Sequence, residues 1–259
     1  MVKGPSEFSF AWRVKLVLRF TLLSFHHPGW LVAFARRGRT GLLRRIVSDS
    51  LDFVRKRPIP ANIQAMCLAQ SVSPLSELGA MQDYLYLIVR MTAPKVVVET
   101  GVFRGISTTF ILAALKDNGA GHLYSLDLPG ASYRTDSGAM DESSIGKFTK
   151  TGYLVPEELK NRWTLIEGDV RVTLPRILAE AGQIDLFLHD SEHTYEMMTW
   201  EFALAYSHLR KGGLLLSDDI SWNAAFADFT KSHPFGWSLT LAGRLGIAQL
   251  PADPPTDTS

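Results

Sequence analysis

The chain has 259 residues, of which 46% are hydrophobic and 20% charged, and its formal net charge is +1. This length suits one large α/β domain, or one domain with an appendage, better than two equal domains. The ordinary globular composition, without a repeat period, excludes a low-complexity or repeat protein.

The first 60 residues carry most of the positive charge. They hold 12 Lys and Arg against 3 Asp and Glu, a net +9, so the remainder of the chain is −8. Their apolar stretch at residues 8–30 is interrupted by Arg13, Lys15 and Arg19, which excludes a transmembrane helix. Two interpretations stay open: helices that pack on the main domain or on another subunit, or a basic surface on anionic lipid. The three charges do not share one helical face, which favours packing.

Cys67 is the only cysteine of the chain, so an intramolecular disulfide and a multi-cysteine zinc site are excluded. A single thiol fits a reducing compartment, and we expect a cytoplasmic location. The surrounding residues, "IQAMCLAQ", indicate a small buried side chain.

From about residue 74, helices alternate with short apolar strands. "SPLSELGAMQDYLYLIVRMT" predicts a helix, and "KVVVET" after Pro94 predicts a buried parallel strand. Further strands are expected at 122–127, 163–169, 184–190 and 212–219, separated by helices at 106–117, 171–181 and 194–210. This alternation predicts a doubly wound, parallel α/β sheet. "GWSLTLAGRLGIAQL" adds an expected antiparallel hairpin around "AGRLG".

Residues 189–193, "HDSEH", match the H-x-x-E-H pattern of inverted zinc peptidases. That site needs both histidines on one face of a helix. His189 closes a predicted strand instead, where successive side chains alternate between faces, so no zinc site is predicted. The segment places Asp190 at the carboxyl end of a buried strand, where ligands bind in open α/β sheets, and His193 on the following loop.

The ends of the first two strands predict a site for a nucleoside-containing cofactor. Glu99 is followed by Gly101 and Gly105, around a turn that enters a helix, where backbone N–H groups can meet a ligand. Asp127 ends the next strand, placed to accept hydrogen bonds from a ribose diol. A dinucleotide site favours G-x-G-x-x-G, whereas bulky residues fill the space between the two glycines here.

The spacing E-x-G-x-x-x-G-x-S, from Glu99 to Ser107, resembles the first motif of class I S-adenosylmethionine-dependent methyltransferases. "YSLDLPG", "TGYLVPEELKNRWTLIEGD", "LFLHDSEHTYE" and "LRKGGLLLSDDI" follow in the family's order, over roughly residues 76 to 250. "HDSEHTYE" paired with "LLLSDDI" is similar to bacterial O-methyltransferases related to catechol and macrolide-sugar enzymes. The resemblance implies a Rossmann-like sheet of seven strands, mostly parallel, with an antiparallel last strand.

The division of the chain follows from these patterns. We expect a basic N-terminal helical extension at 1–73, a methyltransferase domain at 74–250 and a disordered tail at 251–259.

The resemblance also implies roles for individual residues in binding S-adenosylmethionine. The turn from Glu99 to Gly105, with Gly101 and Ser107, would hold the methionine end, and Asp127 the ribose. Asp169 would lie near the adenine, although it is also a candidate helix N-cap, and both can be true. His189 and Asp190 would lie below the reacting methyl, and His189 is alternatively a satisfied strand-end histidine.

Three acidic residues at neighbouring strand ends predict a divalent cation. Asp190 and the pair Asp218 and Asp219 follow adjacent strands about 4.8 Å apart, so their carboxylates should converge and repel unless a cation joins them. Such oxygen ligands suit Mg²⁺ or Mn²⁺, which would position the acceptor hydroxyl. Alternatively, Asp219 caps a helix that begins near Trp222.

His193 is the candidate general base, because histidine titrates near neutral pH. Its spacing from Asp190 matches the acid and base pair of the macrolide-sugar enzymes. A structural histidine in the first turn of a helix is the alternative.

The expected acceptor is a small hydroxylated metabolite or sugar. Residues 128–156 form a long polar insert over the active edge, with Arg134, Lys147 and Lys150 as candidate contacts. Trp222, Asn223 and Phe226 could line the other side. Nucleic acid is not expected, because the catalytic part is net acidic and the N-terminal basic residues form no stacking surface.

Other classes of function stay open beside metal-assisted O-methylation. One is an NAD(P)-binding oxidoreductase on a Rossmann-like sheet. Another is a protein that binds the cofactor without methylating, or a membrane-associated module. Residues 1–60 are the expected site of any peripheral membrane or homo-oligomer contact.

Overall fold

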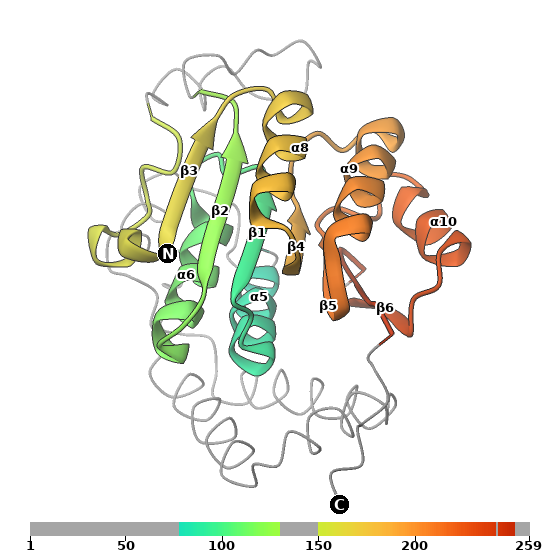
Figure 1. Cartoon of the computed structure of the whole chain (residues 1–259), viewed down its shortest axis with the longest axis horizontal. Helices are drawn as coiled ribbons and strands as arrows, with labels where there is room; N and C mark the ends of the chain where they lie inside the picture. The colour runs from blue at the N-terminus through green and yellow to red at the C-terminus, as the bar shows by residue number, and fades with distance from the viewer. Residues whose placement is uncertain (1–77, 130–149, 242, 252–259) are drawn as a thin grey trace, which may run out of the picture. The chain divides into compact units, whose positions relative to one another are not determined.

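A seven-stranded sheet runs through the part of the chain that the structure, a computed structural model, describes: residues 78–129, 150–241 and 243–251 (Figure 1). The strand order is β3-β2-β1-β4-β5-β7-β6. The first five strands are parallel, and β7 is antiparallel to both β5 and β6. The strands are β1 (Val96–Thr100), β2 (His122–Asp127), β3 (Trp163–Glu167), β4 (Ile184–His189), β5 (Leu209–Ser217), β6 (Trp237–Leu241) and β7 (Leu245–Gln249). The predicted Rossmann-like sheet is therefore confirmed.

Helices cover both faces of this sheet, as expected for right-handed crossovers between parallel strands (Figure 1). In Figure 1, α8, α9 and α10 lie on the face toward the viewer, and α5 and α6 lie behind the sheet. The helices are α5 (Leu78–Thr92), α6 (Ile106–Asn118), α8 (Val170–Ala181), α9 (Tyr195–His208) and α10 (Ala225–Ser232), with a short 3₁₀ helix η3 (Glu157–Arg162) before β3.

Local sequence explains where the helices begin. The Asp169 carboxylate accepts a hydrogen bond from the backbone N–H of Arg171, and this caps α8. The Thr194 hydroxyl does the same for α9, accepting from the N–H of Met197. The predicted N-cap role of Asp169 is confirmed.

The junction between α9 and β5 differs from the prediction. Helix α9 ends at His208 rather than at residue 210, and β5 begins at Leu209 rather than at residue 212. Leu209 is buried and pairs with Ile184 across the sheet, with a register irregularity before Leu186. Burial of this leucine therefore starts the strand three residues before its predicted beginning at Gly212.

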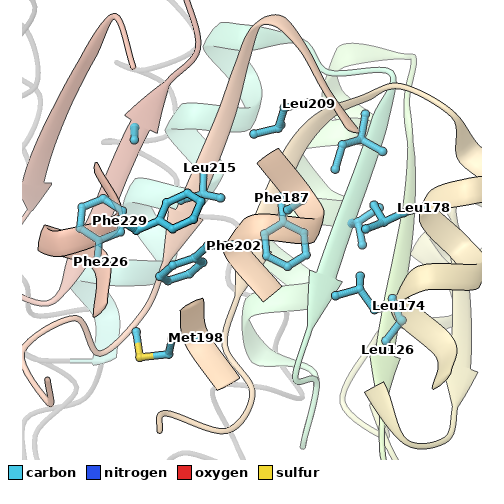
Figure 2. Close-up of a cluster of buried hydrophobic side chains, with 14 of the residues drawn as sticks. Leu126, Leu174, Leu178, Phe187, Met198, Phe202, Leu209, Leu215, Phe226 and Phe229 are labelled. Carbon is cyan, nitrogen blue, oxygen red and sulfur yellow. The ribbon is translucent and has the colours of Figure 1, made fainter. Parts of the chain in front are cut away.

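The main core lies between the sheet and helices α8, α9 and α10 (Figure 2). Aromatic and aliphatic side chains from both layers meet there, including Phe187 of β4, Phe202 of α9 and Leu178 of α8, each fully buried. The Phe202 ring packs edge-on against the Phe226 ring, with centroids 6.2 Å apart. This core holds the strands in register, which places their carboxyl ends along one edge.

Several sequence predictions fall outside the described residues. These are the N-terminal extension at 1–73, the environment of Cys67, the tail beyond residue 251, and the insert positions Arg134 and Lys147. Lys150 is described and is exposed. Within the described ranges, every helix is too short or too polar to span a bilayer.

Candidate functional site

The carboxyl ends of β1, β2, β4 and β5 lie side by side and gather most of the predicted site residues. Thr100 at the end of β1 pairs with His189 of β4, and His189 pairs with Ser217 of β5. The backbone continues this pattern past the strands, because Asp190 N–H donates to the Thr100 carbonyl at 2.8 Å and Asp218 N–H to the His189 carbonyl at 2.9 Å. Loops from three strands therefore meet at one edge.

Gly101 makes the closest of these approaches. Its φ is +82°, and a Cβ on this residue would lie 1.9 Å from the Asp190 carbonyl oxygen. Gly105, with φ +88°, is the N-cap residue of α6. The two glycines let the β1–α6 loop turn sharply against the end of β4.

Asp127 holds that loop from the neighbouring strand. Its Oδ2 accepts hydrogen bonds from the N–H groups of Val102, at 2.8 Å, and Phe103, at 2.6 Å. Its Oδ1 accepts from the Leu128 N–H at 2.7 Å. Phe103 has φ +49°, a conformation that costs a residue with a Cβ. The two bonds to one carboxylate oxygen help to stabilise this conformation.

The Glu99 side chain supports the β1–α6 loop through hydrogen bonds. The side chain is fully buried, and its carboxylate accepts hydrogen bonds from the hydroxyls of Ser107, Thr108 and Ser125 at 2.7 to 2.8 Å. Burial without a cationic partner among these contacts raises the pKa of Glu99 to about 7, although the three hydroxyls oppose the shift.

The acidic residues of β4 and β5 converge as the sequence predicts, but around an arginine. Arg244, between β6 and β7, donates from Nε to Asp218 Oδ1 at 2.7 Å and from Nη2 to Asp218 Oδ2 at 2.6 Å. The same Nε lies 3.0 Å from Asp219 Oδ1. Asp190 lies close enough that burial, Asp218 and Glu99 raise its carboxyl pKa well above the usual range, while Arg244 opposes the shift.

A buried hydrogen-bond network lies beneath the loop that follows β4. The Glu201 carboxylate of α9, itself fully buried, accepts from Thr100 Oγ1 at 2.5 Å and from Ser191 Oγ at 2.6 Å. His189 Nδ1 lies 2.7 Å from the same carboxylate. Because a carboxylate accepts hydrogen bonds, Nδ1 carries the hydrogen in this contact.

His193 lies beside this network with its own ring nitrogen buried. The rings of His189 and His193 meet edge-on with centroids 5.1 Å apart, and the ring centroids of His193 and Trp222 are 5.2 Å apart. The Nε2 atoms of both histidines are buried and have no hydrogen-bond partner within the described part of the chain. Burial, chiefly, lowers the pKa of His193 to about 4, so its imidazole is neutral at pH 7.

Residues 98–220, which contain nearly all of these groups, match the protein family described as "Methyltransferase domain". This region is similar to methyltransferase domains, as the sequence motifs imply. Seven strands in the order found here, with the glycine loop after the first strand, agree with that assignment.

Solved structures of other proteins share the fold of this chain at low sequence identity. The methyltransferase PaMTH1 of Podospora anserina, bound to SAH, is 16% identical and superposes with a TM-score of 0.51 over 79% of this chain and 95% of its own. A Staphylococcus aureus protein provisionally assigned as a caffeoyl-CoA O-methyltransferase is 14% identical, with a TM-score of 0.52 over 77% and 96%. No curated protein matches the chain significantly.

The residues predicted to bind the cofactor fall into two groups. Gly101, Gly105 and Asp127 shape the loop itself, and Asp169 stands at the start of the next helix. Glu99 and Ser107 bond to each other beneath the loop, so their observed part is to support it. Direct contact of any of them with S-adenosylmethionine stays a prediction.

The predicted metal ligands do not fit a metal site in this structure. Both oxygens of Asp218 and one of Asp219 are paired with the Arg244 guanidinium, which supplies the positive charge expected from a cation. Within the described residues, no three His, Cys, Asp or Glu side chains are arranged to hold a metal ion. Helix α10 begins at Ala225 with Ala224 as its N-cap residue, and the Ala225 N–H donates to Asn223 Oδ1, so the capping alternative for Asp219 is wrong as well.

Of the residues expected to line the acceptor side, two lie beside His193 and one does not. Trp222 is 65% exposed beside His193, and Asn223 Nδ2 donates to the His193 carbonyl at 3.0 Å. Phe226 does not line the site, because its ring is buried in the core against Phe202 (Figure 2). Glu201 and Arg244 were missed by sequence reasoning, since neither belongs to a recognisable motif.

Replacing Glu99 with glutamine is expected to remove a pH dependence of stability. Between pH 4.5 and about 7, folded Glu99 keeps a proton that the unfolded chain has lost, so stability falls as pH rises through this window. The shift corresponds to about 3 kcal/mol. Urea unfolding of wild type and Glu99→Gln from about pH 5 to pH 8 measures it as the difference between the two profiles. Parallel profiles would contradict the prediction.

Proposed function

We propose that the chain transfers a methyl group from S-adenosylmethionine to a hydroxyl of a small metabolite or sugar, with His193 as general base. One observation carries this proposal: a neutral, buried imidazole nitrogen without a partner in the described residues, at the edge of the sheet where cofactors bind in this fold. Its backbone is held by Asn223, and its ring is flanked by His189 and Trp222.

Methyl transfer from S-adenosylmethionine to a hydroxyl requires the protein to position the two reactants and to remove one proton. S-adenosylmethionine supplies an electrophilic methyl group on a positively charged sulfur. The acceptor oxygen forms the new C–O bond as the C–S bond breaks, the bonding pair passes to sulfur, and the hydroxyl proton moves to His193 Nε2. Holding the reacting atoms in line and removing the proton are the steps that these side chains can perform.

Asp190 completes the proposed pair with His193. The loop of residues 190–194 joins the two, and Gly101 of the β1–α6 loop packs closely against the Asp190 carbonyl. We propose that the Asp190 carboxyl helps to orient the acceptor hydroxyl. Metal assistance, which the sequence predicted, is left out of the proposal because Arg244 already pairs with two of the three carboxylates.

The β1–α6 loop argues against a dinucleotide-dependent oxidoreductase. The side chains of Val102, Phe103 and Arg104 stand between the two glycines, where a pyrophosphate needs open backbone. The proposed partner of the chain is a small-molecule substrate. Membrane or subunit contact through residues 1–60 concerns positions outside the described residues and stays a prediction.

Asp127→Ala is expected to weaken S-adenosylmethionine binding about ten- to a hundredfold. The variant loses a charged hydrogen-bond acceptor for the ribose, worth about 1.5–3 kcal/mol, and releases the N–H groups of Val102 and Phe103 that order the loop. Calorimetric titration of the full chain with S-adenosylmethionine measures the change. Unchanged affinity in a variant that unfolds at the wild-type temperature would move the ribose contact to another residue.

The whole proposal is tested by incubating the full chain with S-adenosylmethionine and a panel of hydroxylated metabolites and sugars. Mass spectrometry then detects acceptors that gain one methyl group. NAD(P) titration serves as the control for the oxidoreductase alternative. Heat with NAD(P) and none with S-adenosylmethionine would overturn the proposal.

A further inference from the structure

Arg244, directly before β7, places its guanidinium beside the acidic cluster formed by Asp190, Asp218 and Asp219. Arg244 follows Gly243, and its backbone is tied at both groups: its N–H donates to the Leu241 carbonyl and its carbonyl accepts from the Ile220 N–H, each at 3.1 Å. The residue before Ile220 is Asp219. The arginine backbone is thus pinned next to the acids with which its side chain pairs.

The pairing occupies the atoms that a metal ion would need. A guanidinium presents its N–H groups as a planar fork, and Asp218 receives two of them, one on each carboxylate oxygen. The Asp218 side chain is 1% exposed, so it has little access to another cation. Asp219 is turned toward the same arginine by a left-handed backbone, with φ +48°.

Charge balance supports the same conclusion. The carboxylates of Asp190, Asp218 and Asp219 interact with one another, and Arg244 is the cation that offsets them. A divalent ion brought to these carboxylates would be repelled by the guanidinium and would have to displace its hydrogen bonds. The arginine and a metal ion are therefore alternatives at this position.

We propose that Arg244 is a positioning residue that takes the place of a divalent cation at the acceptor side of the site, so that methyl transfer by this chain needs no metal. The fork holds Asp218 and Asp219 in place and, through the Asp218 N–H bonded to the His189 carbonyl, holds the ends of β4 and β5 together. The part that concerns methyl transfer rests on the proposed function. The part that concerns metal binding does not.

A corollary follows for the arginine-free chain. Removing the guanidinium leaves three carboxylates at adjacent strand ends without their cation, which is the donor set that Mg²⁺ or Mn²⁺ takes. We therefore expect Arg244→Ala to gain affinity for Mn²⁺ that the wild type lacks. The double variant Arg244→Ala with Asp218→Asn should lose it again.

The test measures Mn²⁺ binding to the full chain by electron paramagnetic resonance of the free ion, which requires no acceptor and no activity. Expected results are at least about tenfold tighter binding in Arg244→Ala than in wild type, and reversal in the double variant. Arg210→Ala is the matched control, because the Arg210 side chain is 32% exposed, against 33% for Arg244. Arg210 pairs with Asp185 at the amino-terminal end of β4, away from the three carboxylates. It should bind Mn²⁺ as wild type does.

Mn²⁺ binding to the chain with its arginine intact can overturn the proposal. Saturable Mn²⁺ binding to wild type that Asp218→Asn abolishes would show that metal and arginine share the site after all. Should Arg244→Ala not fold, Arg244→Gln replaces it, since glutamine removes the positive charge but keeps part of the side chain, and it is likewise expected to gain affinity for Mn²⁺. Once an acceptor is known, methyl transfer by wild type should be unchanged in excess chelator. If chelator stops the transfer while S-adenosylmethionine still binds, the metal-free role of Arg244 is refuted. The proposed methyltransferase activity would still stand.

Discussion

His193→Ala is expected to slow methyl transfer by about 10²–10⁴-fold, the range for loss of a general base. S-adenosylmethionine affinity should stay within about twofold, because a base acts mainly on the transition state. Burial lowers the pKa of His193 to about 4, so the proton-accepting form dominates near neutrality. The loss should therefore be similar from about pH 6 to pH 8. Single-turnover rates with bound cofactor measure the chemical step directly.

His208→Ala provides the matched control for that experiment. His208 is the last residue of α9, where its Nδ1 lies 3.0 Å from the Leu204 carbonyl, at the end of the helix remote from the loop that carries His193. Its removal should leave the transfer rate unchanged. A His193→Ala enzyme with wild-type rate would reduce the site to positioning alone and would transfer the base role to another group, of which His189 Nε2 is the nearest candidate.

Gly101→Ala is expected to abolish measurable S-adenosylmethionine binding and to lower the free energy of unfolding by about 2–5 kcal/mol. A left-handed backbone costs alanine about 1–2 kcal/mol, and forcing a methyl group into filled space costs about 1–3 kcal/mol more. The new Cβ would lie 1.9 Å from the Asp190 carbonyl oxygen and 2.8 Å from the Ser191 nitrogen. The β1–α6 loop and the segment after β4 must therefore move apart. Urea unfolding and calorimetry measure the two effects.

Gly119→Ala isolates the contribution of close packing. Gly119 also has a left-handed backbone, with φ +69°, but an added Cβ meets nothing within 4 Å. This variant should lose only the conformational part, about 1–2 kcal/mol, and should bind S-adenosylmethionine as wild type does. Equal losses of stability and affinity in the two variants would refute the close approach of Gly101 to Asp190.

The strands and their ends could be predicted because a buried parallel strand has a distinctive local composition. "KVVVET", "HLYSLD" and "IDLFLHD" are short runs rich in apolar, β-branched or leucine residues between polar turns. The second matches β2 residue for residue, and β4 ends one residue before the predicted end of the third. Alternation with helices then requires parallel strands, whose carboxyl ends share one edge. Asp127, Asp190 and Asp218 could therefore be brought together without a structure.

Glu201 could not be found in this way. It lies in the middle of a predicted helix, where an acidic residue is ordinarily solvated, and "TWEFAL" contains no motif. Packing of α9 on β4 and β5 turns this side chain inward against Thr100 and His189 and removes its exposure entirely. Which face of a helix is buried depends on the neighbour that it meets, and that information is not local.

The same distinction explains the charge at the acceptor side. The sequence by itself determined that carboxylates meet at the ends of β4 and β5 and that a positive group must accompany them, because converging like charges repel. It did not determine which cation, since Arg244 lies 26 residues beyond Asp218 in a hairpin whose role looked purely structural. Only the tertiary structure decided this, because the antiparallel register of β7 on β5, with Ser217 opposite Gly246, carries the turn back over the acids.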